Sequence, residues 1–272
     1  MSSAPSKKPP SADPAVDLDY SVDDFDFEIE HLPDSTFLFQ RMEDALVLEG
    51  TVTGGRTLDV ACGVGKLAAR FQQAGGEAWG IEPSADMLAL SRFVIDRDAV
   101  ALTRGVAETL PFQDATFDRI VCMGALDHFV EPRSFMQDAA RLLKPDGRIV
   151  IALANYDSLS CRIGRGIGRP LQRVASRLLR RPSEQRPYWQ PPDDHIHKGN
   201  LAFVRSLGGS DLTLERCYGI SLLWLFPGWG WLLAVMPAKL RHAAAGALDR
   251  RAHGNVGLAD TIISVWRKRE MA

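Results

Sequence analysis

Short runs of apolar and β-branched residues alternate with amphipathic stretches through the middle of the chain. The predicted strands are residues 56–60, 77–81, 99–103, 117–123 and 148–153. Apolar residues at helical spacing predict helices over residues 35–48, 66–74, 84–94 and 132–143. Strands separated by helices of this length need right-handed crossovers, so the pattern predicts a doubly wound, mostly parallel α/β sheet.

Two later stretches depart from this alternation. Residues 162–181 contain seven Arg and no acid, with Arg162, Arg165, Arg169, Arg173, Arg177 and Arg180 at helical spacing. Glycines disfavour a helix in the first half of this stretch, so we expect the helix to begin near Pro170. Residues 217–238 carry no charge and contain three Trp. Pro and Gly interrupt them near residue 227, which predicts a buried or interfacial helical hairpin rather than a membrane span.

The composition is that of an ordinary soluble globular protein, with 46% apolar and 24% charged residues among 272. Residues 1–30 are predicted to form a disordered, acidic arm, because they begin Ser/Pro/Ala-rich and continue acidic without Lys or Arg. Residues 31–272 are predicted to form one domain.

Charge and cysteine usage exclude several classes of protein. Lys+Arg 32 against Asp+Glu 34 gives a net charge of -2, which argues against nucleic-acid binding through overall basicity. The four Cys contain no CxxC pair, and no secretory signal precedes them, so a disulfide scaffold and a zinc ribbon are not expected. We therefore expect a cytoplasmic, reducing location.

The turn after the first predicted strand is the first candidate for a ligand site. Gly63 and Gly65 allow a tight turn close to a ligand, and Glu82 ends the second strand, where a carboxylate can accept ribose hydroxyls. With Ala68, the glycines also fit the dinucleotide fingerprint, so an NAD-type oxidoreductase is an alternative. Asp59 beside the turn would repel a pyrophosphate and attract a ligand carrying ammonium and sulfonium groups.

Four motifs then occur in a recognisable order: Leu58–Gly65, Gly80–Ser84, Ala107–Asp118 and Leu143–Arg148. In this order they resemble class I S-adenosylmethionine-dependent methyltransferases, in particular the small-molecule and lipid branch that includes quinone-biosynthesis methylases. The resemblance covers about residues 35–155 well and the tail from Asp194 loosely.

That resemblance implies a Rossmann-like, seven-stranded sheet whose last strand is antiparallel. Residues 212–220 and 261–267 would form the final hairpin. A helical cap over the substrate would come from about residues 155–211 and 221–258.

The resemblance also implies contacts to S-adenosylmethionine. The matching positions are Asp59, Ala61, Gly63, Gly65, Glu82, Pro83, Met87, Ala107, Glu108 and Met123. Asp59 would hold the methionine ammonium and Glu82 the ribose hydroxyls. Val106 stands where the family usually has Asp, so adenine recognition would pass to Glu108, to backbone near Ala107 or to packing.

Catalytic residues are predicted from the needs of methyl transfer, which depends on alignment and, for a hydroxyl acceptor, on a base. His195 is the expected base or acceptor-orienting group. His128 is a second candidate, with packing at a helix start as its alternative role. The acids and histidines around His195 do not complete a ligand set, so no metal is expected.

The sequence thus predicts methyl transfer from S-adenosylmethionine to a small or lipid-like acceptor, with a hydroxyl as the expected target. A non-catalytic partner protein of the same fold is a further alternative to the oxidoreductase. Peripheral membrane contact through residues 162–181 and 217–238 competes with a solvated Arg face and a Trp-closed dry pocket.

Overall fold

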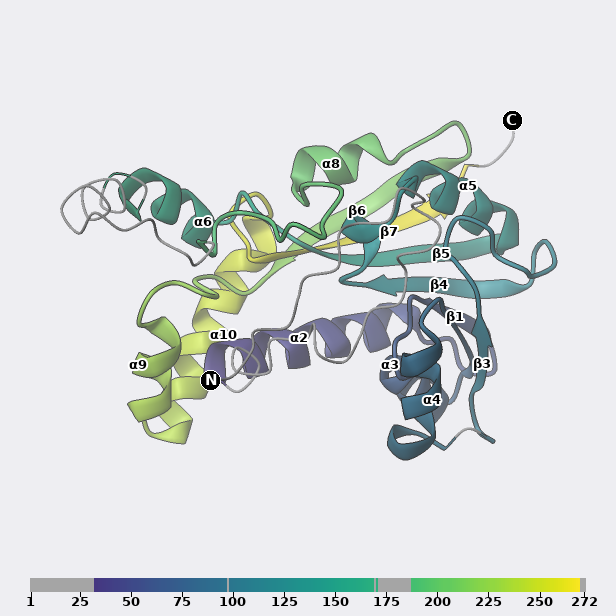
Figure 1. The fold of residues 1–272 in the computed structure, drawn as a ribbon, viewed down its shortest axis with the longest axis horizontal. Helices are drawn as coiled ribbons and strands as arrows, with labels where there is room; N and C mark the ends of the chain where they lie inside the picture. Colours follow the sequence, from purple (N-terminus) through teal and green to yellow (C-terminus); the bar gives the residue numbers. More distant parts are fainter. Residues whose placement is uncertain (1–31, 97, 169, 171–186, 270–272) are drawn as a thin grey trace, which may run out of the picture.

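The computed structural model describes residues 32–96, 98–168, 170 and 187–269. Seven strands form one sheet in the order β3-β2-β1-β4-β5-β7-β6 (Figure 1). They are β1 (Arg56–Val60), β2 (Glu77–Glu82), β3 (Ala101–Arg104), β4 (Phe117–Met123), β5 (Leu143–Ala154), β6 (Leu212–Ile220) and β7 (Thr261–Lys268). β1 to β5 pair in parallel, whereas β7 is antiparallel to β5 and β6. The expected doubly wound sheet with an antiparallel last strand is confirmed.

Helices cover both faces of this sheet (Figure 1). The helices of the described residues are α2 (Pro33–Gly50), α3 (Lys66–Gln73), α4 (Ala85–Val94), α5 (Pro132–Leu142), α6 (Leu159–Ile163), α8 (Leu201–Ser206), α9 (Trp229–Val235) and α10 (Ala238–Gly254), of which α6 and α9 lie away from the sheet. Two short turns add to these, the 3₁₀ turn η2 (Leu126–His128) and the π-helical turn η3 (Gly164–Gly168). α2 and α3 lie on one face, and α5 and α8 lie on the other (Figure 1).

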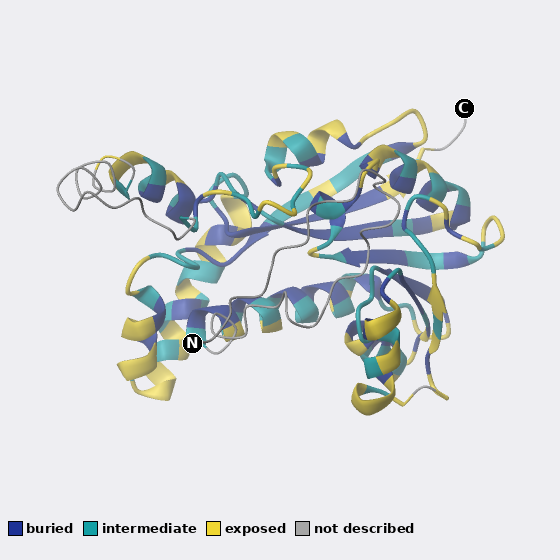
Figure 2. Ribbon diagram, viewed as in Figure 1, coloured by how far each residue is buried: buried dark blue, intermediate teal, exposed yellow. Residues whose placement is uncertain are grey.

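The central strands are buried on both faces, as Figure 2 shows by their dark blue colour. Leu58 and Ile120 are buried in the core beneath α5, while Val121 packs with α2 and α3 on the opposite face. The sequences of such strands are almost continuously apolar, because both faces of the sheet pack against helices. Ser84 caps α4 by accepting a hydrogen bond from the Met87 amide at 3.3 Å, as its residue type predicts.

The start of β5 differs from the prediction. We expected a turn at residues 145–147 and a strand from Arg148, but β5 begins at Leu143. Phe117 pairs with Leu143, whereas Arg119 pairs with Arg148, so the intervening residues of β5 leave the regular ladder. Pro145 lies in this irregular part, where its missing N–H costs no ladder hydrogen bond.

The prediction of a helical hairpin within residues 217–238 is wrong in its extent. Cys217–Ile220 complete β6, α9 is short, and the second helix is the charged α10. The chain does break near Pro227, between β6 and α9, as the sequence indicates. Among the described residues, no helix is both long enough and apolar enough to span a bilayer.

The Arg-rich stretch is described only at its start. Arg162 and Arg165 lie in α6 and η3, so this part is helical despite its glycines. A Cβ at Gly164 or Gly168 would lie 2.4 Å from the Trp189 ring, so these glycines permit close packing of that ring. The helix expected beyond Pro170 lies outside the described residues, as does the acidic arm 1–30.

Buried carboxylates hold the loop between β6 and α9. Three non-glycine residues of this loop have positive φ angles: Ser221, Leu223 and Leu225. The Trp224 amide donates to Asp260 Oδ2 at 2.9 Å, and the Leu225 amide donates to Asp34 Oδ2 at 3.4 Å. Burial raises the pKa of Asp260 to about 7. These contacts connect the base of α9 to α2 and to the start of β7.

Gly199 joins the segment before α8 to the end of β5, and it has no room for a side chain. Its carbonyl accepts from the Tyr156 amide at 2.9 Å, and a Cβ would lie 2.2 Å from the Ala154 carbonyl oxygen. Because that oxygen is backbone, we expect Gly199→Ala to lower the free energy of unfolding by about 1–3 kcal/mol in urea denaturation. Gly209→Ala, with no atom within 4 Å of the new Cβ, is the matched control. Equal stability of the two variants would contradict this packing.

Candidate active site

The turn between β1 and α3 has left-handed backbone at three positions, with φ angles of 56° at Ala61, 54° at Gly63 and 80° at Gly65. Glycine adopts this conformation without steric cost. At Ala61 the β-carbon makes the same conformation unfavourable by about 1–2 kcal/mol. The turn therefore brings bare backbone to the carboxyl end of β1, at the N-terminus of α3.

Glu82 and Asp59 lie near the carboxyl ends of the adjacent strands β2 and β1. Glu82 Oε2 accepts from the Gly63 amide at 2.8 Å, and Oε1 accepts from the Ser84 amide at 3.0 Å. These bonds hold the Glu82 carboxylate against the glycine turn. Each oxygen keeps a further lone pair that a ligand hydroxyl could use.

Asp59 is buried, and its Oδ2 has no hydrogen-bond partner among the described residues. Desolvation, with a smaller contribution from the Glu82 charge, raises the pKa of Asp59 to about 8. A backbone hydrogen bond from Ala68 opposes this shift only in part, so the ionised carboxylate is costly, and a cationic ligand group would compensate it. The donor set therefore fits the ammonium group of S-adenosylmethionine.

The remaining candidate cofactor residues differ in their burial and in their hydrogen bonds. Met87, in the first turn of α4, and Ala107 are buried, whereas Met123 is half-buried at the end of β4. Pro83 follows Glu82 directly, and its carbonyl accepts from Arg104 Nε at 2.9 Å. Glu108 Oε1 accepts from the Val130 amide at 2.9 Å, so this carboxylate is committed to the segment after η2.

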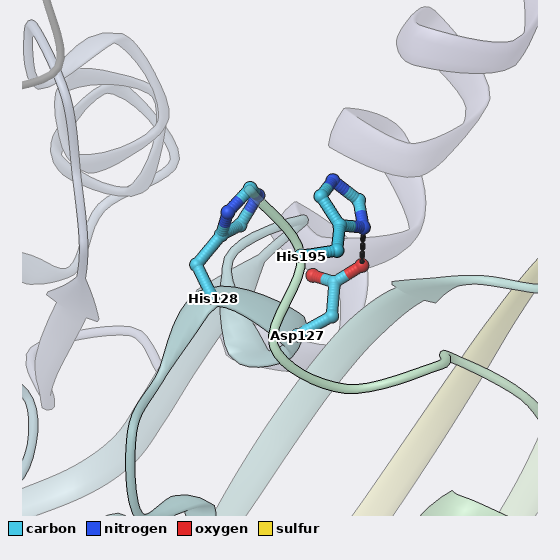
Figure 3. Close-up of side chains that lie close together, drawn as sticks. All are labelled: Asp127, His128 and His195. Atoms are coloured by element: carbon cyan, nitrogen blue, oxygen red, sulfur yellow. Dashed lines mark ion pairs between the residues drawn. The ribbon is translucent and has the colours of Figure 1, made fainter. Parts of the chain in front are cut away.

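Figure 3 shows a second group of side chains, formed by Asp127, His128 and His195. Asp127 and His128 belong to η2, directly after β4. The Asp127 carboxylate is buried, and its Oδ2 lies 2.7 Å from His195 Nδ1. The rings of His128 and His195 are 4.2 Å apart between centroids and nearly perpendicular. Burial lowers the pKa of His128 and favours its neutral form.

Backbone hydrogen bonds bring these distant residues together. The amides of Ile196 and His197 donate to the Asp127 carbonyl at 2.9 and 3.0 Å. The Tyr156 hydroxyl lies 3.3 Å from His195 Nδ1 and approaches the ring from the end of β5. His197, in contrast, stacks on Phe203 with ring centroids 5.2 Å apart.

An ionic anchor holds the segment that carries His195. Asp157 lies 2.9 Å from the Arg165 guanidinium and 2.7 Å from Lys198 Nζ, and it accepts from Asn200 Nδ2 at 3.0 Å. Lysine and arginine neighbours lower the pKa of Asp157, although its partial burial opposes them. This anchor connects η3 to the residues that follow His195.

Sequence reasoning identified His128 and His195 but missed Asp127 and Tyr156 as their partners. The available signal for Asp127 was its place just after a central strand, where ligands bind in such sheets. One oxygen of Asp127 and one nitrogen of each histidine lie within 4.8 Å of one another, a group that could hold a metal ion. No metal was expected from the sequence, because the acids and histidines near His195 do not by themselves complete a ligand set.

Part of the chain is similar to known methyltransferases. A family model described as a methyltransferase domain matches residues 58–151. Relatives include the uncharacterized methyltransferase YcgJ of Bacillus subtilis, 35% identical over 99 residues, which are 35% of this chain and 39% of the relative. A demethylmenaquinone methyltransferase of Clavibacter sepedonicus is 37% identical over 101 residues, covering 37% and 41%. A ubiquinone biosynthesis O-methyltransferase of Cronobacter sakazakii is 31% identical over 114 residues, covering 41% and 47%.

The matched part of the chain spans less than half the length of these curated relatives. Solved structures extend the likeness of fold. The YcgJ structure has a TM-score of 0.53 at 17% identity, covering 86% of this chain and 100% of its own. An S-adenosylmethionine-dependent methyltransferase of Mesorhizobium loti has a TM-score of 0.53 at 14% identity, covering 89% and 100%. Residues 58–151 thus match a methyltransferase domain, and the seven-stranded sheet has the Rossmann-like fold of class I S-adenosylmethionine-dependent methyltransferases.

Proposed function

We propose that the chain transfers the methyl group of S-adenosylmethionine to an oxygen of a small or lipid-like acceptor. The observation that carries the proposal is the juxtaposition of two groups at one edge of the sheet. The buried Asp59 oxygen without a partner lies beside the glycine turn, and the Asp127–His195 contact follows the neighbouring strand β4. The first group suits a cationic cofactor, and the second suits a hydroxyl acceptor.

Cofactor binding would use residues from three strand ends. Asp59 would bind the ammonium, and the turn containing Ala61, Gly63 and Gly65 would accommodate the methionine part. The Glu82 carboxylate would accept from the ribose hydroxyls. Pro83, Met87 and Met123 would pack on the nucleoside. Adenine recognition would rest on Ala107 and nearby backbone more than on Glu108, whose Oε1 already binds the Val130 amide.

In the proposed reaction the acceptor oxygen attacks the methyl carbon as the carbon–sulfur bond breaks. The electron pair of that bond remains on sulfur, which gives S-adenosylhomocysteine, and the hydroxyl proton leaves to solvent through the His195 side of the site. Alignment of donor and acceptor supplies much of the rate. His195 and His128 would orient and activate the acceptor hydroxyl. An NAD-type oxidoreductase is disfavoured because a pyrophosphate would bring further negative charge, and no compensating cation, beside the Asp59 and Glu82 carboxyl groups.

The names of the relatives support a quinone-like acceptor, because two of those compared methylate ubiquinone or menaquinone precursors by name. An apolar surface on this chain agrees with a lipid-like acceptor. Its exposed members are Trp231, Leu232 and Val235 of α9 and Leu240 of α10. Lys239 and Arg241 begin α10 directly beside it. Apolar side chains with a Trp and adjacent cations are typical of a surface that docks on an anionic bilayer.

Membrane contact is therefore proposed for a cytoplasmic protein, at the α9–α10 surface. The other surface considered from the sequence, the Arg stripe of residues 162–181, falls largely outside the described residues. The loop below α9 leaves the sheet where Ile220 pairs with Thr261 and Thr261 pairs with Ala154. A docked α9 would thus lie at the edge of the sheet that carries the proposed active site.

The protonation of Asp59 should tie stability to cofactor binding. Its pKa is raised in the folded chain, so its neutral form favours folding, and this contribution is lost as the pH rises from about 4 through about 8. Relative to Asp59→Asn, the unliganded wild type should become less stable between about pH 6 and about pH 9, measured by thermal unfolding.

S-adenosylmethionine should restore wild-type stability at the higher pH, because its ammonium pairs with the ionised carboxylate. Asp59→Asn should weaken its binding by about 1–3 kcal/mol in calorimetry. Asp249→Asn, at a less buried carboxylate bound to Arg41, controls for the loss of a negative charge. Tight binding of NAD with no binding of S-adenosylmethionine would refute the proposed cofactor.

Removal of His195 should affect the methyl-transfer step and not cofactor binding. We expect His195→Ala to lower turnover roughly 10²-fold while calorimetry gives unchanged affinity for S-adenosylmethionine. His242→Ala, at an exposed histidine of α10, should keep full turnover. Full turnover by His195→Ala would mean that His195 only packs, and absence of turnover in the wild type would favour a non-catalytic partner protein.

The α9–α10 surface should direct the chain to anionic vesicles. In co-sedimentation at low salt, the wild type should bind vesicles with anionic lipid and not neutral ones, and salt should weaken binding. The double variant Trp231→Gln/Val235→Gln should lose most of this binding. The matched control is Leu48→Gln/Phe93→Gln, at residues that are equally exposed but lie elsewhere. A wild type that remains in the supernatant with anionic vesicles would exclude docking and point to a soluble acceptor.

A further inference from the structure

We infer that Asp127, His128 and His195 form a binding site for a divalent transition-metal ion. Each residue offers one ligand atom, and the three atoms lie within 4.8 Å of one another (Figure 3). Metal ligands at about 2.0–2.2 Å from one ion lie about 3–3.5 Å apart, so small side-chain rotations would close the set. The site itself stands on this geometry, and its use in catalysis rests on the proposed function.

The donor types select the class of ion. Two imidazole nitrogens and one carboxylate oxygen suit Zn²⁺, Fe²⁺, Co²⁺ or Mn²⁺, whereas Mg²⁺ and Ca²⁺ prefer oxygen ligands alone. Three protein ligands leave at least one coordination position for water or substrate. Such an open set is the arrangement of catalytic sites, whereas structural sites use four protein ligands.

The Asp127 carboxylate has His195 as an ion-pair partner but lacks the hydrogen bonds that a buried carboxylate needs. Its residue is 1% exposed, and neither carboxylate oxygen has a hydrogen bond in the described part of the chain. His195 Nδ1 lies 2.7 Å from Oδ2, yet the angles of this contact are not those of a hydrogen bond. A cation between the carboxylate and the imidazoles would compensate the buried charge and use the lone pairs that converge there.

The surrounding contacts hold these side chains in place. The backbone of Asp127 accepts the two amides that follow His195, which ties both ligand segments together. Asp194 Oδ2 lies 3.7 Å from His128 Nδ1, and the Tyr156 hydroxyl lies 3.3 Å from His195 Nδ1. Polar groups just outside a metal site commonly orient the ligand rings in this way.

The location gives the ion a role in the proposed reaction. The site follows β4, which pairs with the strand that ends in the glycine turn. An acceptor hydroxyl in the open coordination position would become more acidic, because a Lewis acid withdraws electron density from the oxygen. Its proton would pass to solvent as the oxygen takes the methyl group and sulfur retains the electron pair. His195 would then act as a ligand that positions the ion.

Metal binding to the full-length chain tests the inference directly. The protein is freed of metal with a chelator and titrated with CoCl₂ or ZnCl₂, with calorimetry and the visible absorption of Co²⁺ as readouts. We expect one ion per chain, with Co²⁺ bands of nitrogen and oxygen ligation. His128→Ala and Asp127→Asn should each weaken binding roughly tenfold or more. His242→Ala and His253→Ala, both at exposed histidines of α10, should bind as the wild type does.

Thermal unfolding is measured with each titration, because replacement of the buried Asp127 can destabilise the fold. His128 is half-buried, so we expect its replacement to affect stability less. Zn²⁺ should raise the melting temperature of the wild type and not that of His128→Ala. Absence of one-to-one binding by the wild type, or equal binding by all variants, overturns the inference and leaves a metal-free Asp127–His195 pair.

S-adenosylmethionine binding is measured on the same metal-free protein. If it persists without metal binding, only this inference fails; if metal binds but S-adenosylmethionine does not, only the proposed function fails.

Discussion

The pairing of β1 between β2 and β4 is the constraint on which the candidate site depends. Parallel pairing brings the carboxyl ends of these strands to one edge, so the glycine turn, Glu82 and η2 become neighbours. β5 extends the same edge in parallel, and the antiparallel β7 returns to it with Thr261 beside Ala154. Side chains that lie far apart in the sequence therefore meet at this edge, although no sequence pattern links them.

Buried carboxylates occur repeatedly at this edge, in two kinds of setting. Asp34 and Asp260 accept amides of the strained loop before α9, so the backbone itself supplies partners. Asp59, like Asp34 and Asp260, leaves one carboxylate oxygen without a hydrogen bond among the described residues, and both oxygens of Asp127 lack one. Unlike Asp34 and Asp260, Asp59 and Asp127 lie at the carboxyl ends of the paired strands β1 and β4. We attribute a stabilising role to Asp34 and Asp260, since their hydrogen bonds connect the loop before α9 to α2 and to the sheet. Carboxylates of the second kind are more often found where a ligand supplies the charge.

Local sequence determined much of this protein. The β1 and β4 boundaries follow from the apolar pattern, because strands buried on both faces have few alternatives. Ser84 and the glycines of the first turn act through their own backbone and nearest neighbours, so their roles are legible without a structure. The family resemblance rests on these same local motifs, which explains why fold and cofactor class could be predicted together.

Tertiary structure alone decided what surrounds the acceptor side. Neither the early start of β5 nor the short α9 could be predicted, since both depend on pairing and packing with distant residues. Asp127 follows β4, and His195 precedes α8. The two meet because the amides of Ile196 and His197 donate to the Asp127 carbonyl. No periodicity encodes such a contact. The sequence could therefore supply the two histidines as candidates, but only the folded chain brings their rings together beside the buried Asp127 carboxylate.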